Sequence, residues 1–98
     1  MSSLARDPFE ALRDPHRRSI VQTLAGREMS VGELADGLPI SRPAVSRHLR
    51  LLKEARLVKD RPDGVKRIYR LDNRGADEVR RYMERMWGDA ETRPKSLL

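Results

Sequence analysis

The chain has 98 residues, enough for one small domain with a modest hydrophobic core. It contains no cysteine, which excludes disulfides, thiolate metal cages and a cysteine nucleophile. It also lacks an apolar run long enough for a membrane span or a signal peptide, so we expect a soluble cytoplasmic protein. The net charge of +6 is concentrated in residues 41–71, which hold ten Lys/Arg and three Asp/Glu, and this basic segment predicts a polyanionic partner.

The first half of the chain predicts three short helices, each with a recognisable start. Asp7-Pro8 and Asp14-Pro15 both place an N-cap before a proline at the first helical position. The sequence SVGE at 30–33 is a capping box that begins a third helix. A short turn containing glycine then leads to Ser41, the N-cap of a longer helix. This succession predicts a helix-turn-helix motif over about residues 30–55.

The helix predicted over residues 41–55 has an unusual polar face. Its apolar residues Val45, Leu49 and Leu52 share one side of a helical wheel. The opposite side holds arginines and small hydroxyl groups, and arginine bonds guanine in a bidentate manner while serine contacts bases or phosphates. We therefore expect this face to enter a groove of DNA rather than to be an ordinary solvated surface. The candidate DNA contacts in this segment are Ser41, Arg42, Pro43, Ser46, Arg47 and Arg50.

After Leu57 the apolar period changes from 3.6 to 2, which predicts a β-hairpin over about residues 57–71. The sequence PDGV at 62–65 is a hairpin turn signal between the two strands. We expect Arg61, Lys66 and Arg67, near the tip, to contact DNA. Arg70 lies near the base of the hairpin, where we expect it to pair only with Asp72. The alternative is that the hairpin is merely a solubilising loop.

A last helix is predicted over about residues 74–88, with Asp72 or Asn73 as its cap. Its apolar stripe is wide, and a chain of this size offers little surface to cover it. The stripe therefore predicts a homodimer rather than a purely intramolecular core. The predicted interface residues in this helix are Val79, Met83, Met86 and Trp87.

A helix-turn-helix followed by a basic hairpin is a winged helix. The fold class predicted is mainly α with a small β-hairpin, in the order α-α-α-α-β-β-α, within a single DNA-binding and dimerisation domain over residues 1–98. The sequences ALRDPHRRSIVQTLAGREMSVGELADGL, SRPAVSRHLRLLKEARLV and RPDGVKRIYRL make the chain resemble the ArsR/SmtB family of bacterial transcriptional repressors, over roughly residues 7–88.

This resemblance implies a homodimer joined through the first and last helices, which adds Phe9 and Leu12 to the predicted interface. It also implies that the helix over 41–55 reads the major groove of a palindromic operator, with the hairpin as the wing. The metal-sensing branches of the family carry cysteines in the helix matching 30–37, or His/Asp/Glu clusters in the last helix. Because this chain has no cysteine and no histidine in its last helix, it resembles the branch typified by autorepressing regulators.

We therefore expect no metal site, no cofactor and a DNA affinity that does not respond to metal ions, while any inducer stays open. The two histidines, His16 and His48, lie in distant segments of the sequence. No Ser/His/Asp set, glycine-rich phosphate loop or paired carboxylates indicate an enzyme. Two alternatives remain: a winged helix that binds RNA or protein, and a sensor whose inducer site uses no cysteine.

Overall fold

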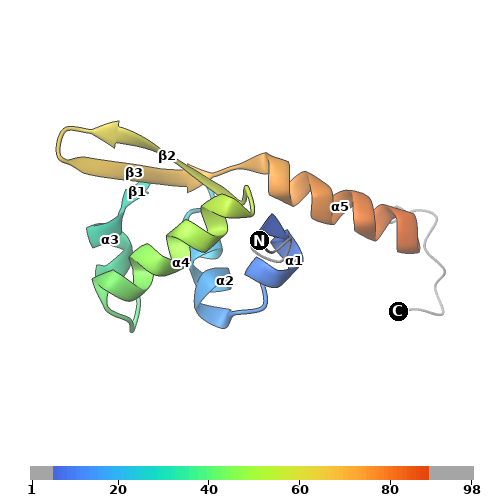
Figure 1. Cartoon of the computed structure of the whole chain (residues 1–98), viewed down its shortest axis with the longest axis horizontal. Helices are drawn as coiled ribbons and strands as arrows, with labels where there is room; N and C mark the ends of the chain where they lie inside the picture. The colour runs from blue at the N-terminus through green and yellow to red at the C-terminus, as the bar shows by residue number, and fades with distance from the viewer. Residues whose placement is uncertain (1–5, 89–98) are drawn as a thin grey trace.

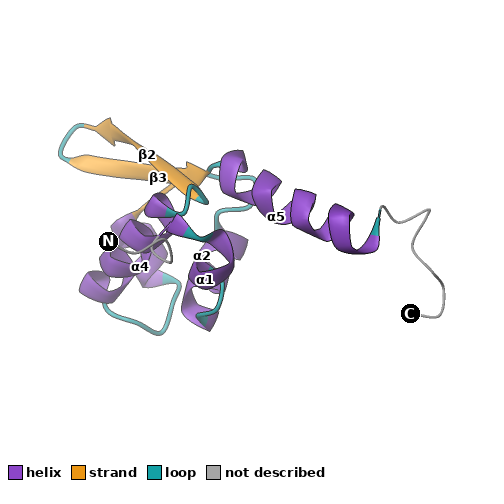
Figure 2. Ribbon diagram, turned by 45° about the vertical axis from the view of Figure 1, so that its right-hand side comes forward, coloured by secondary structure: helices purple, strands orange, loops and turns teal. Residues whose placement is uncertain are grey.

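A computed structural model describes residues 6–88. The first four helices form a body, from which the hairpin and the last helix extend in opposite directions (Figures 1 and 2). No helix among residues 6–88 is long and apolar enough to cross a membrane. The elements in chain order are α1 (Pro8–Ala11), α2 (Pro15–Thr23), β1 (Met29–Ser30), α3 (Val31–Asp36), α4 (Arg42–Glu54), β2 (Val58–Asp63), β3 (Lys66–Leu71) and α5 (Asn73–Trp87).

The helix starts predicted from the sequence are confirmed by their capping hydrogen bonds. Asp14 Oδ1 accepts from the backbone N–H of His16 at 2.7 Å and of Arg17 at 3.1 Å. The capping box is complete, since Ser30 Oγ accepts from Glu33 N at 3.2 Å and Glu33 Oε1 accepts from Ser30 N at 2.8 Å. These side chains satisfy backbone donors that have no partner within their helix. Asp7, Ser41 and Asp72 cap α1, α4 and α5 in the same way.

The sheet has three antiparallel strands in the order β1-β3-β2, whereas the sequence predicted only the two strands of the hairpin. The missed strand, β1, has two residues and pairs Met29 with Tyr69 and Ser30 with Ile68. The hairpin turn is also shorter than predicted, because β2 continues to Asp63, which pairs with Lys66. Gly64, with a φ of +62°, occupies the first position of the resulting two-residue turn, where a positive φ is required.

The hydrophobic core lies between α2, α3 and α4 and fixes how α4 is turned. Val45, Leu49 and Leu52 of α4 are fully buried. They share the core with Ile20 of α2, Leu24 directly after α2, and Leu34 of α3. Burying a side chain of this size contributes about 1.5–3 kcal/mol. Because the apolar side of α4 is held inward by these contacts, the polar side of α4 faces solvent.

The start of α5 rests directly on the end of α4. Arg56, just after α4, has a φ of +60°, and its carbonyl oxygen accepts a hydrogen bond from Gly75 N at 2.8 Å. A Cβ at position 75 would lie 2.6 Å from the carbonyl oxygen of Ala55 and 2.7 Å from that of Arg56. Only glycine fits without a shift of the backbone, so this contact fixes the position of α5 relative to α4.

Candidate nucleic-acid interface

The outward face of α4 carries the residues predicted to read DNA. Ser46, Arg47 and Arg50 are exposed, as are Arg42 and Pro43 in the first turn. Within residues 6–88, neither Arg47 nor Arg50 forms an ion pair. Their guanidinium groups therefore keep their donors available to a partner. Ser41 is exposed as well, although its Oγ already accepts from Ala44 N at 3.3 Å as the helix cap.

Arg42 differs from the other arginines of α4 because its side chain lies back over α3. A side chain at position 32 would collide with its guanidinium group, so Gly32 leaves the space that Arg42 occupies. Arg42 thus lines a groove of about 500 Å³ between α3, the start of α4 and the hairpin. Lys66 and Glu33 line the same groove. To reach a DNA base, Arg42 would have to swing out of it.

One face of the hairpin is basic and is organised by a single carboxylate. Side chains alternate along a strand, and residues that pair across two strands point to the same face. The pairs Lys59–Arg70, Arg61–Ile68 and Asp63–Lys66 therefore place four basic residues on one face: Lys59, Arg61, Lys66 and Arg70. Glu28, which precedes β1, accepts hydrogen bonds from Arg61 at 2.8 Å and from Arg70 at 3.4 Å. The hydrogen bond from Arg61 is the main reason that the pKa of Glu28 lies below its usual value.

The predicted pairing of Arg70 with Asp72 is therefore wrong. Arg70 is paired with Glu28, 42 positions away in the sequence. Asp72 is instead held by Arg74, whose Nη2 lies 2.6 Å from Asp72 Oδ2, and it also accepts from Arg74 N at 3.0 Å as the cap of α5.

The opposite face of the hairpin is joined to α4 through Asp60. The Asp60 side chain is only 5% exposed and contacts Lys53 Nζ of α4 at 2.9 Å and Arg67 Nε of β3 at 2.6 Å. Burial by itself would raise the pKa of Asp60, but hydrogen bonds from Lys53 and Arg67 outweigh it and lower the pKa. Asp60 therefore stays ionised and holds Arg67, one of the predicted DNA contacts, against the hairpin.

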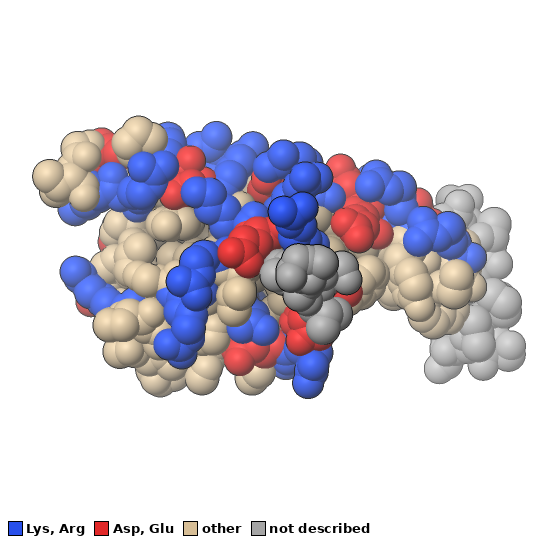
Figure 3. Space-filling view, in the orientation of Figure 1, with Lys and Arg blue, Asp and Glu red and all other residues tan. Residues whose placement is uncertain are grey.

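Basic side chains cover much of the surface of the hairpin and of the outer side of α4 (Figure 3). Of the nine predicted DNA contacts, five lie in α4, Ser41 is its N-cap, and three lie in the hairpin, whose strand β2 is in contact with α4. The arrangement joins a helix with free arginines to a hairpin whose Arg61 and Arg67 already hold carboxylates.

The chain is similar to proteins that carry this combination of motifs. Residues 12–61 match the model of a helix-turn-helix domain family. The HTH-type transcriptional regulator Rv2034 of Mycobacterium tuberculosis is 52% identical over 84 residues, which cover 86% of this chain and 78% of that protein. The crystal structure of a possible transcriptional regulator for arsenical resistance superposes with a TM-score of 0.76, at 44% identity, over 85% of this chain and 86% of that one. An ArsR-like regulator from Rhodococcus sp. RHA1 gives a TM-score of 0.74 at 31% identity, over 86% of this chain and 79% of that one.

The chain belongs to the ArsR/SmtB family. It is a DNA-binding transcriptional regulator of the ArsR/SmtB type with a winged helix-turn-helix fold, as the sequence predicted. The Transcriptional repressor SdpR of Bacillus subtilis, 39% identical over 65% of this chain and 71% of that protein, is another relative. These relatives are named as regulators and not as enzymes.

A second surface of this ArsR/SmtB chain is apolar and lies at the other end of the molecule from the hairpin. Phe9 of α1 and Tyr82 of α5 meet edge to face, with ring centroids 5.1 Å apart, and Trp87 lies 6.4 Å from Tyr82. Met83 and Met86 are 48% and 55% exposed. Figure 3 shows the lower side of this end of α5 as uncharged surface. Of the other predicted interface residues, Val79 is half-buried and Leu12 packs against the core.

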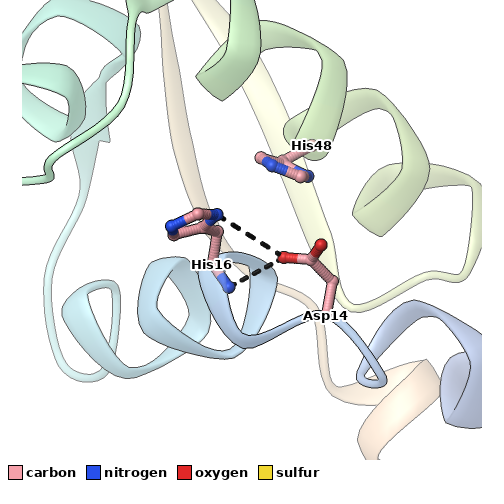
Figure 4. Close-up of side chains that lie close together, drawn as sticks. All are labelled: Asp14, His16 and His48. Atoms are coloured by element: carbon pink, nitrogen blue, oxygen red, sulfur yellow. Dashed lines mark hydrogen bonds and ion pairs between the residues drawn. The ribbon is translucent and has the colours of Figure 1, made fainter.

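Sequence reasoning missed one cluster in this ArsR/SmtB fold, because its members are distant in the chain. His16 and His48, from α2 and α4, have ring centroids 5.9 Å apart, and Asp14 lies beside both (Figure 4). His48 is buried, and this burial is the main reason that its pKa is lowered. Burial alone would raise the pKa of Asp14, but hydrogen bonds from the backbone of Arg17 and His16 lower it. The sequence offered no signal for this contact, since only the packing of α2 on α4 creates it.

Proposed function

We propose that this chain is a homodimeric repressor that binds a palindromic operator. In this proposal α4 lies in the major groove of each half-site, the hairpin contacts the flanking DNA backbone, and α1 and α5 form the dimer interface. DNA binding and dimerisation thus reside in one domain. The name of the relative SdpR, a transcriptional repressor, supports repression over activation.

The proposal that α4 reads DNA is supported above all by the exposure of Arg47 and Arg50 and by their lack of ion pairs within residues 6–88. Both are exposed on α4, opposite the buried Leu49 and Leu52, and neither has an ion pair within the described part of the chain. Arginine donors that are free and held on a rigid helix suit bidentate bonds to guanine O6 and N7. Ser46, exposed on the same face, adds a hydroxyl group that suits base or phosphate contacts.

The exposed apolar face supports the dimeric part. Phe9, Tyr82, Met83, Met86 and Trp87 are each 38–55% exposed, which is unusual for five large apolar residues that lie near one another. A second copy of the same face would cover them and place two α4 helices on one side of the dimer. Dimers of this kind read half-sites about 34–36 Å apart, one turn of DNA.

DNA reading is tested by selecting a binding site from random duplexes and measuring affinity by fluorescence anisotropy. The selected site should be palindromic and should bind far more tightly than a scrambled duplex or an RNA duplex of the same sequence. Selection of a single half-site without symmetry would contradict the palindromic operator. Equal affinity for RNA would favour the alternative of an RNA-binding winged helix.

Dimerisation is tested by sedimentation at micromolar concentration. The parent chain should sediment at twice the monomer mass of 11.3 kDa. Met86→Glu places a charge in the apolar face and should give monomers. Val65→Glu is the matched control, because Val65 is a fully exposed apolar residue at the tip of the hairpin. A parent chain that sediments as a monomer throughout this range would contradict the proposal.

A further inference from the structure

The cluster of Asp14, His16 and His48 has the composition of a metal site. Each residue offers one ligand atom, and these atoms all lie within 4.8 Å of one another. Asp14 and His16 come from the start of α2, while His48 reaches them from the middle of α4 (Figure 4). No other group of three such residues comes together among residues 6–88.

We propose that these three side chains form a binding site for a divalent transition-metal ion of the zinc, cobalt and nickel class. Two imidazoles and one carboxylate suit these ions, whereas calcium and magnesium require mainly oxygen ligands. Three protein ligands leave a fourth position of a tetrahedral ion open to water. The expectation of no metal site rested on the absence of cysteine and on two scattered histidines, and the fold brings those histidines together.

The two carboxylate oxygens of Asp14 differ in their contacts, so that one can cap α2 while the other binds a metal ion. Oδ1 accepts both capping hydrogen bonds, from His16 N and Arg17 N. Oδ2 has no hydrogen-bond partner among the described residues, so it is available as a ligand without loss of the cap. In a tetrahedral zinc site, ligand atoms lie about 3.3 Å apart, given bonds of about 2.0–2.1 Å. The three ligand atoms lie within 4.8 Å of one another, so they must move closer together to bind an ion. The His16 side chain is 45% exposed and therefore has the freedom to turn toward the other two.

Arg17 is the group that opposes the ion. Its Nη1 lies 3.4 Å from His48 Nδ1, and its Nε donates to the carbonyl oxygen of Ala11 at 2.6 Å. A bound cation has to displace Nη1 or use the other ring nitrogen of His48. Removing this positive charge should therefore strengthen metal binding. Arg17→Gln removes the charge and keeps a donor for Ala11.

An ion at this position would join the start of α2 to the middle of α4. His48 lies on the buried side of α4, away from Arg47 and Arg50, so the ion would sit behind the DNA-facing surface. It would stabilise the folded chain, because the unfolded chain does not hold the three ligands together. The proposal thus stands or falls independently of the operator and of the dimer.

The test uses cobalt as a spectroscopic probe and zinc as its competitor, with a chain freed of any polyhistidine tag. The parent should bind one cobalt per chain with the visible absorption of a four-coordinate ion, and zinc should abolish that absorption and raise the melting temperature. Since the chain has two histidines, His16→Gln leaves only one. Asp14→Asn keeps an N-capping side chain but removes the charge. Both variants should bind at least about 10- to 100-fold more weakly, the loss that even a supporting residue causes.

Asp7→Asn is the matched control, because Asp7 caps α1 before a proline in the same way but lies outside the cluster. It should bind cobalt as the parent does, and Arg17→Gln should bind it more tightly. Changing the buried His48 risks unfolding, so the test rests on the outer ligands. The proposal is overturned if the parent shows no such absorption, or if His16→Gln and Asp14→Asn bind cobalt as well as Asp7→Asn does.

Discussion

Arg47 and Arg50 of α4 differ from Arg61 and Arg67 of the hairpin in whether a carboxylate is already paired with them. Arg47 and Arg50 project from a helix whose other side is buried, and no carboxylate among residues 6–88 pairs with them. Arg61 and Arg67 project from a hairpin and already hold Glu28 and Asp60. A phosphate that approaches the hairpin must therefore compete with a carboxylate, whereas a base edge that approaches α4 meets free donors. If the proposed function holds, this difference predicts that α4 supplies the discrimination between sequences and that the hairpin supplies a weaker attraction to the DNA backbone.

Replacing Arg47 or Arg50 with alanine should have the largest effect on DNA binding. The loss should be about 1–3 kcal/mol on the operator and little on random DNA, because a base-edge contact forms only at the right sequence. Each variant is measured by anisotropy on operator and scrambled duplexes across a salt series. An equal loss of affinity for both duplexes would mean that these arginines contact only phosphates.

Asp60→Asn should lower the free energy of unfolding by about 1.5–3 kcal/mol, the range for hydrogen bonds to charged groups. The reason is that Asp60 is almost buried and joins α4 to the hairpin through Lys53 and Arg67. The control is Asp63→Asn, at the exposed end of β2. Urea unfolding measures the free energy of unfolding of both variants. If Asp60→Asn lost no more stability than Asp63→Asn, the ion pairs of Asp60 would contribute no more than an exposed aspartate does.

The same variant should change how stability depends on pH. Because the folded-state pKa of Asp60 is lowered, its stabilisation is present above the unfolded value of about 3.9 and is lost as the pH falls through the folded-state pKa. The loss of stability from pH 6 toward pH 3 should thus be shallower in Asp60→Asn than in the parent.

Arg67→Ala should have a smaller effect than the α4 variants, and an equal one on operator and random DNA. The salt slope should become shallower by about one, as for the loss of one phosphate contact. Anisotropy across the salt series gives the slope directly. A loss confined to the operator would place sequence reading in the hairpin and would reverse the comparison with α4.

Glu28→Gln should have the smallest effect, and in the opposite direction. Without the carboxylate, Arg61 and Arg70 are free for phosphates, so both duplexes should bind slightly more tightly. The salt slope should steepen by up to about 0.9 for each phosphate gained. Glu78→Gln, an exposed change on α5, is the control. Weaker binding would show that Glu28 orients the arginines for DNA rather than competing with it.

The sequence was sufficient where a local rule decides the structure. The caps at Asp14, Ser30 and Ser41 mark helix starts because their bonds reach only two or three residues. The side of α4 that faces solvent followed from its apolar period. Strand β1 could not be predicted, since two residues become a strand only by pairing with β3.

Features that depend on long-range contacts were missed for the same reason. The partner of Arg70 is 42 positions away, and the contact of His16 with His48 spans 32 residues, so neither leaves a local pattern. The difference between paired and free arginines is of this kind too. The sequence predicts both Arg47 and Arg67 as DNA contacts, on a helix and on a hairpin, but only the fold shows that Arg67 is paired with Asp60 while Arg47 has no ion pair among residues 6–88.

Gly75 lies so close to the end of α4 that any side chain at this position would push α5 away and tilt it about this point. With 15 residues, α5 is about 22 Å long. Trp87 lies 12 residues beyond Gly75, about 18 Å along the helix, so a side chain at position 75 that tilted α5 by about 10° would move its far end by about 3 Å, close to the rise of one base pair. In a dimer joined through α5, such a tilt would change the separation of the two α4 helices. The choice of glycine at one position would then set which operator spacing the protein accepts.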